Sequence, residues 1–503
     1  MKMKFLIRSS MMRYTSIITG LLLIFILNAC DKRFEEVNTN PNGISDVDPA
    51  HLFATAARAQ FRSGITPYDY QMAGQIGHIF TGVFVERFID QYEQDLSGST
   101  YESLYNTVYQ SLIRYYHEIL LLTGPGMEKE NAFQYAVADV MAVLSFSKLT
   151  DAFGDIPYFN GGLGVVGEMK PVYDSQETIY LDMIERLRMD IETLKQADGS
   201  VGLIGQDPIF KDDPELWLRF ANSLRLRLAM RMRHVEPATA ADIITECLAE
   251  PLLTSNLHNA VQLGIEGDNS QLFSPWYGTF SYYNFRISDR VVTRLESTND
   301  PRLPIYATQI SDSTYKGFQN GLVEEVFSEE IQLEHSFPGE HLVGQGAPTY
   351  LMTAAEITFL QAECALFNLG GTDANAHYRN GIQIAMERAG VEPEDIAAFL
   401  ETETATLSGT QEEQFEQICE QMWLAFIPNT AEAYAMMRRT GYPHIPERDG
   451  IVTDRGDTEG ELPSRLIYPL SEKQRNTENV QKAINDLPGG DELKSRVWWD
   501  VRR

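Results

Sequence analysis

Residues 353–389, TAAEITFLQAECALFNLGGTDANAHYRNGIQIAMERA, carry the clearest signal of architecture in this chain. Small and apolar residues recur at helical spacing on both sides of Gly370-Gly371, which predicts a helix, a glycine stop and a second helix. The unit approaches the roughly 34-residue repeat of tetratricopeptide arrays, although the strict consensus of that repeat is absent. We therefore predict a mostly α-helical protein, a tetratricopeptide-like scaffold of degenerate helical hairpins.

The helical pattern extends outward from this stretch over most of the chain. In Asn131 to Leu149, apolar residues recur three and four positions apart, as on the buried face of a packed helix. The same spacing predicts further helices over Ala50 to Phe61, Tyr70 to Tyr92, Tyr101 to Leu122, Gln176 to Gln196, Pro214 to Arg233, Pro237 to Leu248, Gln411 to Phe426 and Thr430 to Arg438.

The pattern changes between Leu253 and Tyr350, which form an insert of about residues 253–350. Alternating apolar residues and frequent Gly, Pro, Ser and Asn predict loops and short strands there. A long irregular insert on a rigid scaffold is typical of a binding region, because its loops are free to vary. We expect the ligand-binding part of the protein in this insert.

Aromatic residues cluster in the insert and beside one earlier turn. Their faces provide apolar platforms for the C–H faces of sugars or for peptide side chains, while neighbouring polar groups fix the ligand's orientation. For any one of these rings, packing the insert against the scaffold is an equally ordinary role. The candidate ligand-binding residues are Trp276, Tyr277, Tyr282 and Tyr283, with Tyr92 and Tyr101 flanking the Ser/Gly turn.

The N-terminus has the form of a lipoprotein signal. Four basic residues precede an apolar run from Ile17 to Leu27, which is shorter than the ~20 residues needed to span a bilayer. Leu27-Asn28-Ala29-Cys30 follows, which predicts removal of residues 1–29 and lipidation of Cys30. We expect a lipidated tether over residues 30–48 and one folded domain over residues 49–503.

Charge and cysteine content limit the classes of partner. The 503-residue chain has a formal charge of -30, and removing residues 1–29, with four basic and no acidic residues, leaves 474 residues and -34. Such a charge disfavours nucleic acid and anionic lipid as partners. Cys247, Cys364 and Cys419 lie far apart, which indicates small buried residues and leaves one disulfide open, without a disulfide framework or zinc site.

Motifs for other chemistry lack the context that they need. Gly162 to Gly167 (GLGVVG) has the letters of a dinucleotide fingerprint without the strand and helix that must flank it. Asn38 to Gly43 imitates the start of a calcium loop, but Pro49 stands where a bidentate Glu is required. No G-x-S-x-G is present, and 71 acidic residues make any chosen carboxylate pair uninformative. We expect no enzyme, no cofactor and no metal.

Short motifs run in order over almost the whole mature chain, and together they resemble the SusD/RagB family, in particular the SusD-like nutrient-binding outer membrane lipoproteins. The motifs are FEEVNTNPN (34–42), LTDAFGDIPY (149–158), PVYDSQETIY (171–180), WLRFANSLRLR (217–227), NDPRLP (299–304), MTAAEI (352–357), EAY (432–434), RRTGYP (438–443) and RLIYP (465–469) with Glu472. Their residue types suggest structural roles; Arg225 and Arg227, for example, are placed to pair with acidic residues of adjacent helices.

The resemblance implies a surface lipoprotein, lipidated with palmitate, in the outer membrane and facing the cell exterior. Family members act as a lid on a SusC-like TonB-dependent barrel, bind oligosaccharides or sometimes peptides without cleaving them, and pass them to the barrel. The binding residues of the family vary with the nutrient, so the aromatic candidates rest on physical reasoning alone. A peptide-binding role and a helical-repeat scaffold for protein interactions remain the alternatives, and a surface hydrolase is a third.

Overall fold

The computed structural model describes residues 47–62, 67–82, 87–95, 99–197, 202–203, 205–310, 313–323 and 334–502. Pro49–Arg503 forms one compact unit. The predicted signal sequence, Cys30 and most of the tether lie outside the described residues. Among the helices in the described part of the chain, none is long and apolar enough to cross a membrane.

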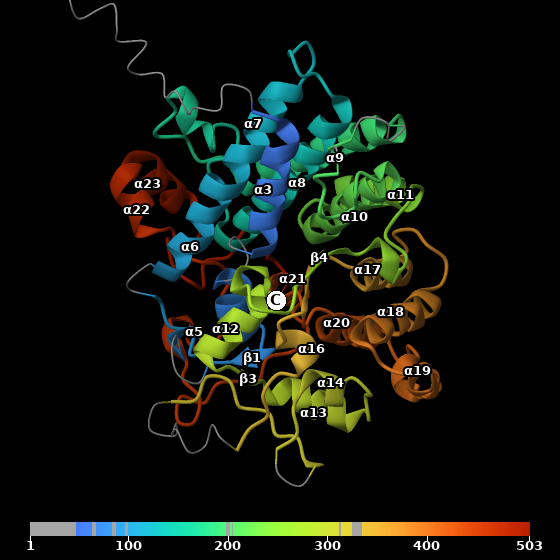
Figure 1. The fold of residues 1–503 in the computed structure, drawn as a ribbon. Coiled ribbons are helices and arrows are strands. Elements are labelled where there is room, and N and C mark those ends of the chain that lie inside the picture. Colours follow the sequence, from blue (N-terminus) through green and yellow to red (C-terminus); the bar gives the residue numbers. More distant parts are fainter. Residues whose placement is uncertain are drawn as a thin grey trace, which may run out of the picture. The chain divides into compact units, whose positions relative to one another are not determined.

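Helices make up most of the compact unit, and the prediction of a mostly α-helical fold is confirmed (Figure 1). The scaffold contains α3 Pro49–Arg62, α4 Gly74–Ile76, α5 Arg87–Asp90, α6 Ser99–Thr107, α7 Arg114–Thr123, α8 Ala132–Phe153, α9 Gln176–Lys195, α10 Pro214–Met232, α11 Pro237–Leu248, α17 Ala354–Leu366, α18 Ala374–Ala389, α19 Pro393–Leu400, α20 Gln411–Ala425, α21 Thr430–Thr440, α22 Leu470–Arg475 and α23 Thr477–Asp486. The π-helices η1 Pro67–Ala73 and η2 Val108–Ile113 continue directly into α4 and α7.

Consecutive helices pack as hairpins. Helix α8 lies against α7 and α9, α10 against α9 and α11, and α17 against α18 and α20. The hairpin predicted from residues 353–389 is present as α17 and α18. Gly370 and Gly371 separate the two helices at φ values of 118° and 82°, a region that favours glycine because it has no Cβ.

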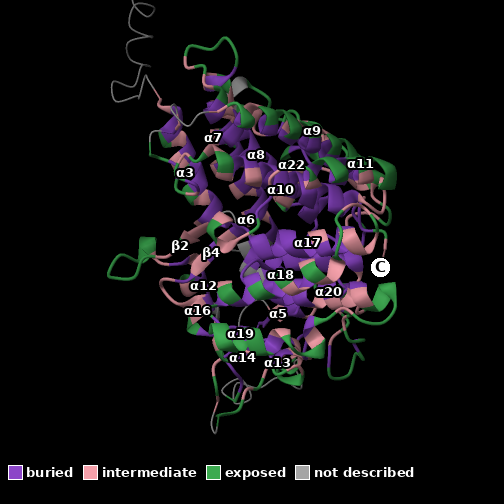
Figure 2. Ribbon diagram, turned by 90° about the vertical axis from the view of Figure 1, so that its right-hand side faces the viewer, coloured by how far each residue is buried: buried purple, intermediate pink, exposed green. Residues whose placement is uncertain are grey.

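Helix α8 lies at the centre of the hairpins that it forms with α7 and α9. It begins after Asn131, whose side chain accepts a hydrogen bond from the Gln134 backbone N–H, and it ends before Gly154 at φ 82°. Its side chains are buried on nearly all sides, beyond the single stripe that the spacing predicted, because α7 and α9 both cover it (Figure 2). Helices buried all round are typical of the interior of large domains.

Ion pairs join α10 to four other helices, and the pairs with α17, α8 and α21 are buried. Arg227 donates two hydrogen bonds to the carboxylate of Glu356 in α17, at 2.5 Å from Nε to Oε1 and 2.7 Å from Nη2 to Oε2. One turn further on, Arg231 pairs with Asp151 of α8 and with Glu432 of α21. Arg225 pairs with Glu246 of α11 at 2.6 Å, so both predicted arginines contact acidic residues of adjacent helices.

A second buried cluster surrounds Glu363 of α17. Its carboxylate accepts hydrogen bonds from Arg439 of α21, at 2.7 Å from Nη2, and contacts Arg233 at 2.9 Å. Burial alone would raise the pKa of Glu363, but the two guanidinium groups outweigh burial and lower this pKa to about 2. The charged form of Glu363 therefore belongs to the folded state.

Two small antiparallel pairs attach the insert to the scaffold. Strand β1 Phe80–Thr81 pairs with β3 Arg286–Ile287, and β2 Ala260–Leu263 pairs with β4 Pro348–Met352. Strand β4 continues through Thr353, whose side chain caps α17 by accepting a hydrogen bond from the Glu356 N–H at 3.3 Å. The insert is thus tied to helices on both sides.

Two sequence predictions fail in this part of the chain. The single helix expected over Tyr70 to Tyr92 is broken, because α4 ends at Gly77, His78 takes φ 54°, and β1 then pairs with the insert. The insert itself contains more helix than the expected loops and strands. Its helices are α12 Pro275–Tyr283, α13 Asp289–Ser297, α14 Leu303–Tyr306 and α16 Glu340–Val343.

The three described cysteines are buried and free, as small apolar residues are. The sequence allows one disulfide between two of these cysteines, and the structure shows none among the three. Burial raises the pKa of the Cys247 thiol to about 12, so the unreactive protonated form prevails at neutral pH.

Replacing Glu363 tests the ionised cluster. With a folded pKa of about 2 and an ordinary value of 4.5, Glu363 contributes stability above pH 4.5 that is lost as the pH falls toward 2. We expect the stability advantage of the wild type over Glu363→Gln in urea unfolding to shrink by roughly 3 kcal/mol between pH 7 and pH 2. The exposed Glu394→Gln variant serves as the control, and an advantage that stays constant with pH would contradict this account.

Candidate functional site

Helix α12 has an inner face fixed by aromatic packing. Pro275 at its first turn suits helix initiation, and Trp276 and Phe280 lie one turn apart on the same side. The ring of Phe80 contacts both, with centroid distances of 5.8 Å to Trp276 and 4.8 Å to Phe280. This packing holds α12 against β1 and leaves its opposite face toward solvent.

Tyr277 projects from the side of α12 next to this inner face and is partly buried. It packs edge-on against Phe273 at 5.4 Å between ring centroids. Tyr277 lines two open hollows, of about 380 and 420 Å³. The first also includes Arg62, Ser270, Phe273, Gly278 and Thr279, and the second Glu266, Thr308, Glu340, Val343 and Gln345.

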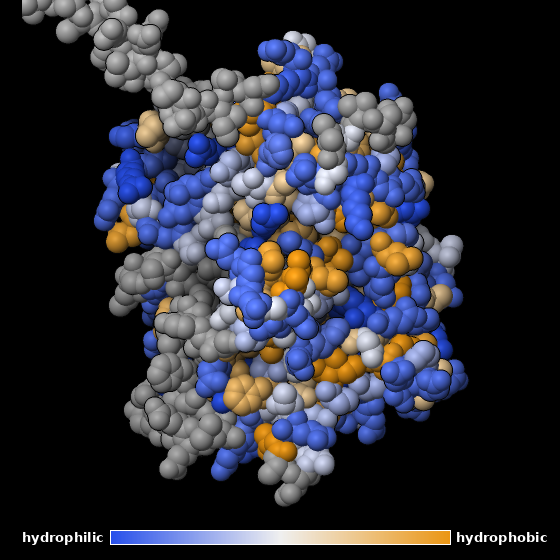
Figure 3. Space-filling model, in the orientation of Figure 1, coloured by the Kyte–Doolittle hydropathy of each residue, from blue (hydrophilic) through white to orange (hydrophobic). Residues whose placement is uncertain are grey.

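The end of β2 and the loop that leads to α12 expose apolar side chains. Leu263, Ile265 and Leu272 are 64%, 58% and 41% exposed. Figure 3 shows apolar side chains gathered near the centre of this face, close to β4 and α12, and Figure 2 shows the loop projecting next to β2. Exposed apolar clusters of this kind mark binding surfaces.

Hydrogen bonds hold this loop in place. Ile265 N donates to Leu272 O at 2.7 Å across the loop, and Ser274 N donates to Gln345 O at 2.7 Å. The Arg62 guanidinium donates to Phe273 O at 2.9 Å. At Gly264 a Cβ would lie 2.0 Å from the Gln345 carbonyl oxygen, so this close approach of two backbones requires glycine.

The site therefore combines an aromatic ring, exposed apolar groups and polar side chains around open hollows. The guanidinium of Arg62 and the oxygens of Glu266, Glu340 and Gln345 offer hydrogen bonds on either side of the Tyr277 ring. This composition suits a ligand with alternating apolar and hydroxyl surfaces. Since both hollows are open to solvent, such a ligand would remain partly hydrated and bind weakly.

Three of the predicted ligand residues are buried. Trp276, Tyr92 and Tyr101 are 2%, 1% and 1% exposed, so none offers a ring face to a ligand. The Tyr92 ring lies under the Arg448 guanidinium at 3.5 Å, and its hydroxyl is 2.8 Å from His78 Nε2. Tyr101 accepts a hydrogen bond from the Asp95 N–H at 3.0 Å. Their positions correct the expectation that these rings are surface platforms.

Tyr277 is the predicted residue that the structure places on an open hollow. The side chains of Tyr282 and Tyr283 lie outside the described residues, so their predicted role stays a prediction. Sequence reasoning missed Phe273 and Gln345, which carry no distinguishing motif. It also missed Arg62, which is 211 positions from its partner Phe273 and meets it only through the fold.

The motifs set aside in the sequence have ordinary structures where they are described. Leu163–Val166 forms a short 3₁₀-helix between Gly162 and Gly167, both in the left-handed region, with no strand or long helix adjoining it. Among the described residues, no group of three or more His, Cys, Asp or Glu side chains is arranged to hold a metal ion.

Comparison with known proteins links this architecture to one family. A family model described as "Starch-binding associating with outer membrane" matches residues 41–469. None of the curated proteins matches the chain. A solved chitin-binding protein matches with a TM-score of 0.79 and 25% identity over 90% of this chain and 100% of that one.

Two further solved structures share the fold. A chitin-binding SusD homolog from Flavobacterium johnsoniae has a TM-score of 0.77 and 24% identity over 90% of this chain and 99% of that one. A SusD homolog from Bacteroides uniformis has a TM-score of 0.77 and 24% identity over 91% of this chain and 100% of that one.

Substitutions at two adjacent positions of α12 test the assignment of inner and outer faces. We expect Trp276→Ala to lower the free energy of unfolding by about 3–5 kcal/mol, because it empties a packed aromatic cluster. We expect Tyr277→Ala to lower it by less, about 1 kcal/mol, because this side chain is only partly buried. Urea unfolding of both variants measures this difference, and equal losses would show that the two faces are wrongly assigned.

Proposed function

The chain belongs to the SusD-like family, whose model is described as starch-binding and associating with the outer membrane, and on that premise we propose that it captures oligosaccharides at the cell surface for uptake. In this proposal the ligand lies over Tyr277, between the two hollows that flank it. The protein cleaves nothing, and it delivers the oligosaccharide to a SusC-like TonB-dependent barrel.

The position of Tyr277 is the observation that supports this proposal most directly. A half-buried ring with an open hollow on each side offers its face to the C–H surface of a sugar. Arg62 on one side, and Glu266 and Gln345 on the other, are placed to hydrogen-bond sugar hydroxyl groups. A chain of sugar units has the length to occupy both hollows at once.

Two classes of glycan are candidate ligands. The family model points to starch, whereas two matched solved structures are chitin-binding proteins. An α-glucan and a chitin oligosaccharide differ in the N-acetyl group, so a comparison of maltohexaose with the hexamer of N-acetylglucosamine separates them.

Calorimetric titration of the soluble domain with these two hexasaccharides tests the site. We expect one of them to bind with a Kd on the order of 0.1–1 mM, because the hollows are open. Tyr277→Ala should weaken binding about fivefold, since a stacked ring contributes about 1 kcal/mol, while Tyr277→Phe should keep most of the affinity.

Tyr115→Ala, in α7, is the matched control and should bind like the wild type. Unchanged affinity of Tyr277→Ala would place the sugar elsewhere. Binding of peptides without either glycan would favour the peptide alternative, and release of shorter sugars would favour a hydrolase.

Surface anchoring is the second part of the proposal. Cys30 is the proposed site of lipidation, and the polar tether up to residue 48 would link the lipid to the folded domain. We expect Cys30→Ser to move the full-length protein from the outer membrane fraction to the soluble fraction and to abolish labelling with a palmitate analogue. Cys247→Ser, which changes a buried free cysteine, should leave both unchanged. Membrane retention of the Cys30→Ser variant would contradict the anchor.

A further inference from the structure

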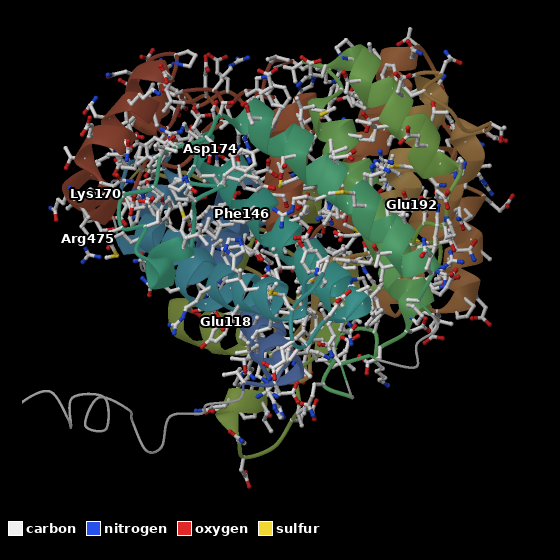
Figure 4. All side chains as sticks on the ribbon, turned by 90° about the horizontal axis from the view of Figure 1, so that it is seen from above. Glu118, Phe146, Lys170, Asp174, Glu192 and Arg475 are labelled. Carbon is white, nitrogen blue, oxygen red and sulfur yellow. The ribbon has the colours of Figure 1, made fainter. Side chains whose placement is uncertain are left out.

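A deep cavity opens between α7, α8 and α9, and it shares no lining residue with the hollows around Tyr277. Its volume is about 520 Å³, within the range of about 300–1,000 Å³ that is usual for small-molecule sites. Figure 4 shows this end of the molecule from above, with Phe146 of α8 near the centre and Glu192 of α9 to its right.

Several polar side chains that line the cavity are hydrogen-bonded to one another. The guanidinium group of Arg186 in α9 binds the carboxylate of Asp139 in α8 through two nitrogens, with 3.1 Å from Nε to Oδ2. It also donates a hydrogen bond to the Tyr158 hydroxyl at 2.7 Å. The Tyr158 hydroxyl in turn donates to Asp182 Oδ2 at 2.6 Å. The charge of Arg186 is therefore balanced by Asp139 before any ligand is considered.

Two further groups have hydrogen-bonding capacity to spare. Asp190 is only 4% exposed, and its Oδ2 accepts no hydrogen bond from any described residue. His117 Nδ1 is also buried and has no partner among the described residues. Buried polar atoms are nearly always hydrogen-bonded, so two such atoms in the lining of one cavity point to a partner that is not part of the chain.

The electrostatic setting of these groups favours a positive partner. Burial and the neighbouring carboxylate of Asp139 raise the pKa of Asp190 well above its ordinary value, and Arg186 offsets only part of this shift. Burial and Arg186 lower the pKa of His117 to about 4, so the imidazole is neutral at pH 7. Among the described residues that line the cavity, four are acidic and Arg186 alone carries a fixed positive charge.

The upper walls of the cavity are apolar. Leu120, Pro125 and Tyr135 line them, together with Met189 and Phe159, which are 50% and 49% exposed. A bound molecule would thus meet carboxyl groups at the depth of the cavity and apolar side chains around its mouth.

We propose that this cavity is a second binding site, which takes a small organic cation with an ammonium group on an apolar body. The ammonium group donates a hydrogen bond to Asp190, and the apolar body packs against Leu120, Met189 and Phe159. Glycan binding at Tyr277 plays no part in this site, so either proposal can fail while the other holds.

The test uses three probes of one shape and different charge. 4-Phenylbutylamine is the cation, 4-phenylbutan-1-ol the neutral analogue and 4-phenylbutyrate the anion. Ligand-observed NMR titration of the soluble domain measures each Kd. We expect the amine to bind at least tenfold more tightly than the alcohol and the carboxylate, and Tyr277→Ala to leave amine binding unchanged.

Asp190→Asn should weaken amine binding at least tenfold, because a charge-assisted hydrogen bond is lost. Glu192→Gln is its matched control: it makes the same change of charge on the same helix, at an exposed position outside the cavity. Thr193→Trp, which narrows the cavity, provides a second variant should Asp190→Asn fold poorly, and it should also reduce binding.

Equal binding of the three probes would overturn the proposal. So would amine binding that survives both Asp190→Asn and Thr193→Trp in folded protein.

Discussion

Buried guanidinium–carboxylate pairs on α10 are the constraint on which the helical scaffold depends. Ions removed from water cost several kcal/mol each unless they are paired with good geometry, so each partner must stay where its counter-charge lies. Arg227 fixes α17 through Glu356, and Arg231 fixes α8 through Asp151 and α21 through Glu432. Elements separated by as many as 201 positions in the chain are thereby held in one arrangement.

This rigid base explains how an insert of short elements keeps a defined shape. Strands β1 and β3 are two residues long and would not be stable alone. They are held because Phe80 of β1 lies under Trp276 and Phe280 of α12. The arrangement of the candidate site around Tyr277 therefore derives both from packing of the insert against Phe80 and from the insert's own hydrogen bonds.

Local sequence patterns predicted the parts of the fold that local rules govern. The hairpin of α17 and α18 follows from helical spacing and two glycines, and α8 from its apolar residues. The break after Ile76 was not predictable, because it depends on pairing between β1 and a strand more than 200 residues away. Within the aromatic run, composition does not separate Trp276 from Tyr277. The helical period of α12 does so, but the sequence pattern of the insert predicts loops and short strands there.

The adjacent residues Trp276 and Tyr277 of α12 differ in what their side chains contact, and therefore in what a substitution at each position changes. Substitution of Trp276 disturbs the core, whereas substitution of Tyr277 mainly alters the lining of the two hollows. The outer positions of this helix can therefore be substituted at a smaller cost in stability than the inner positions.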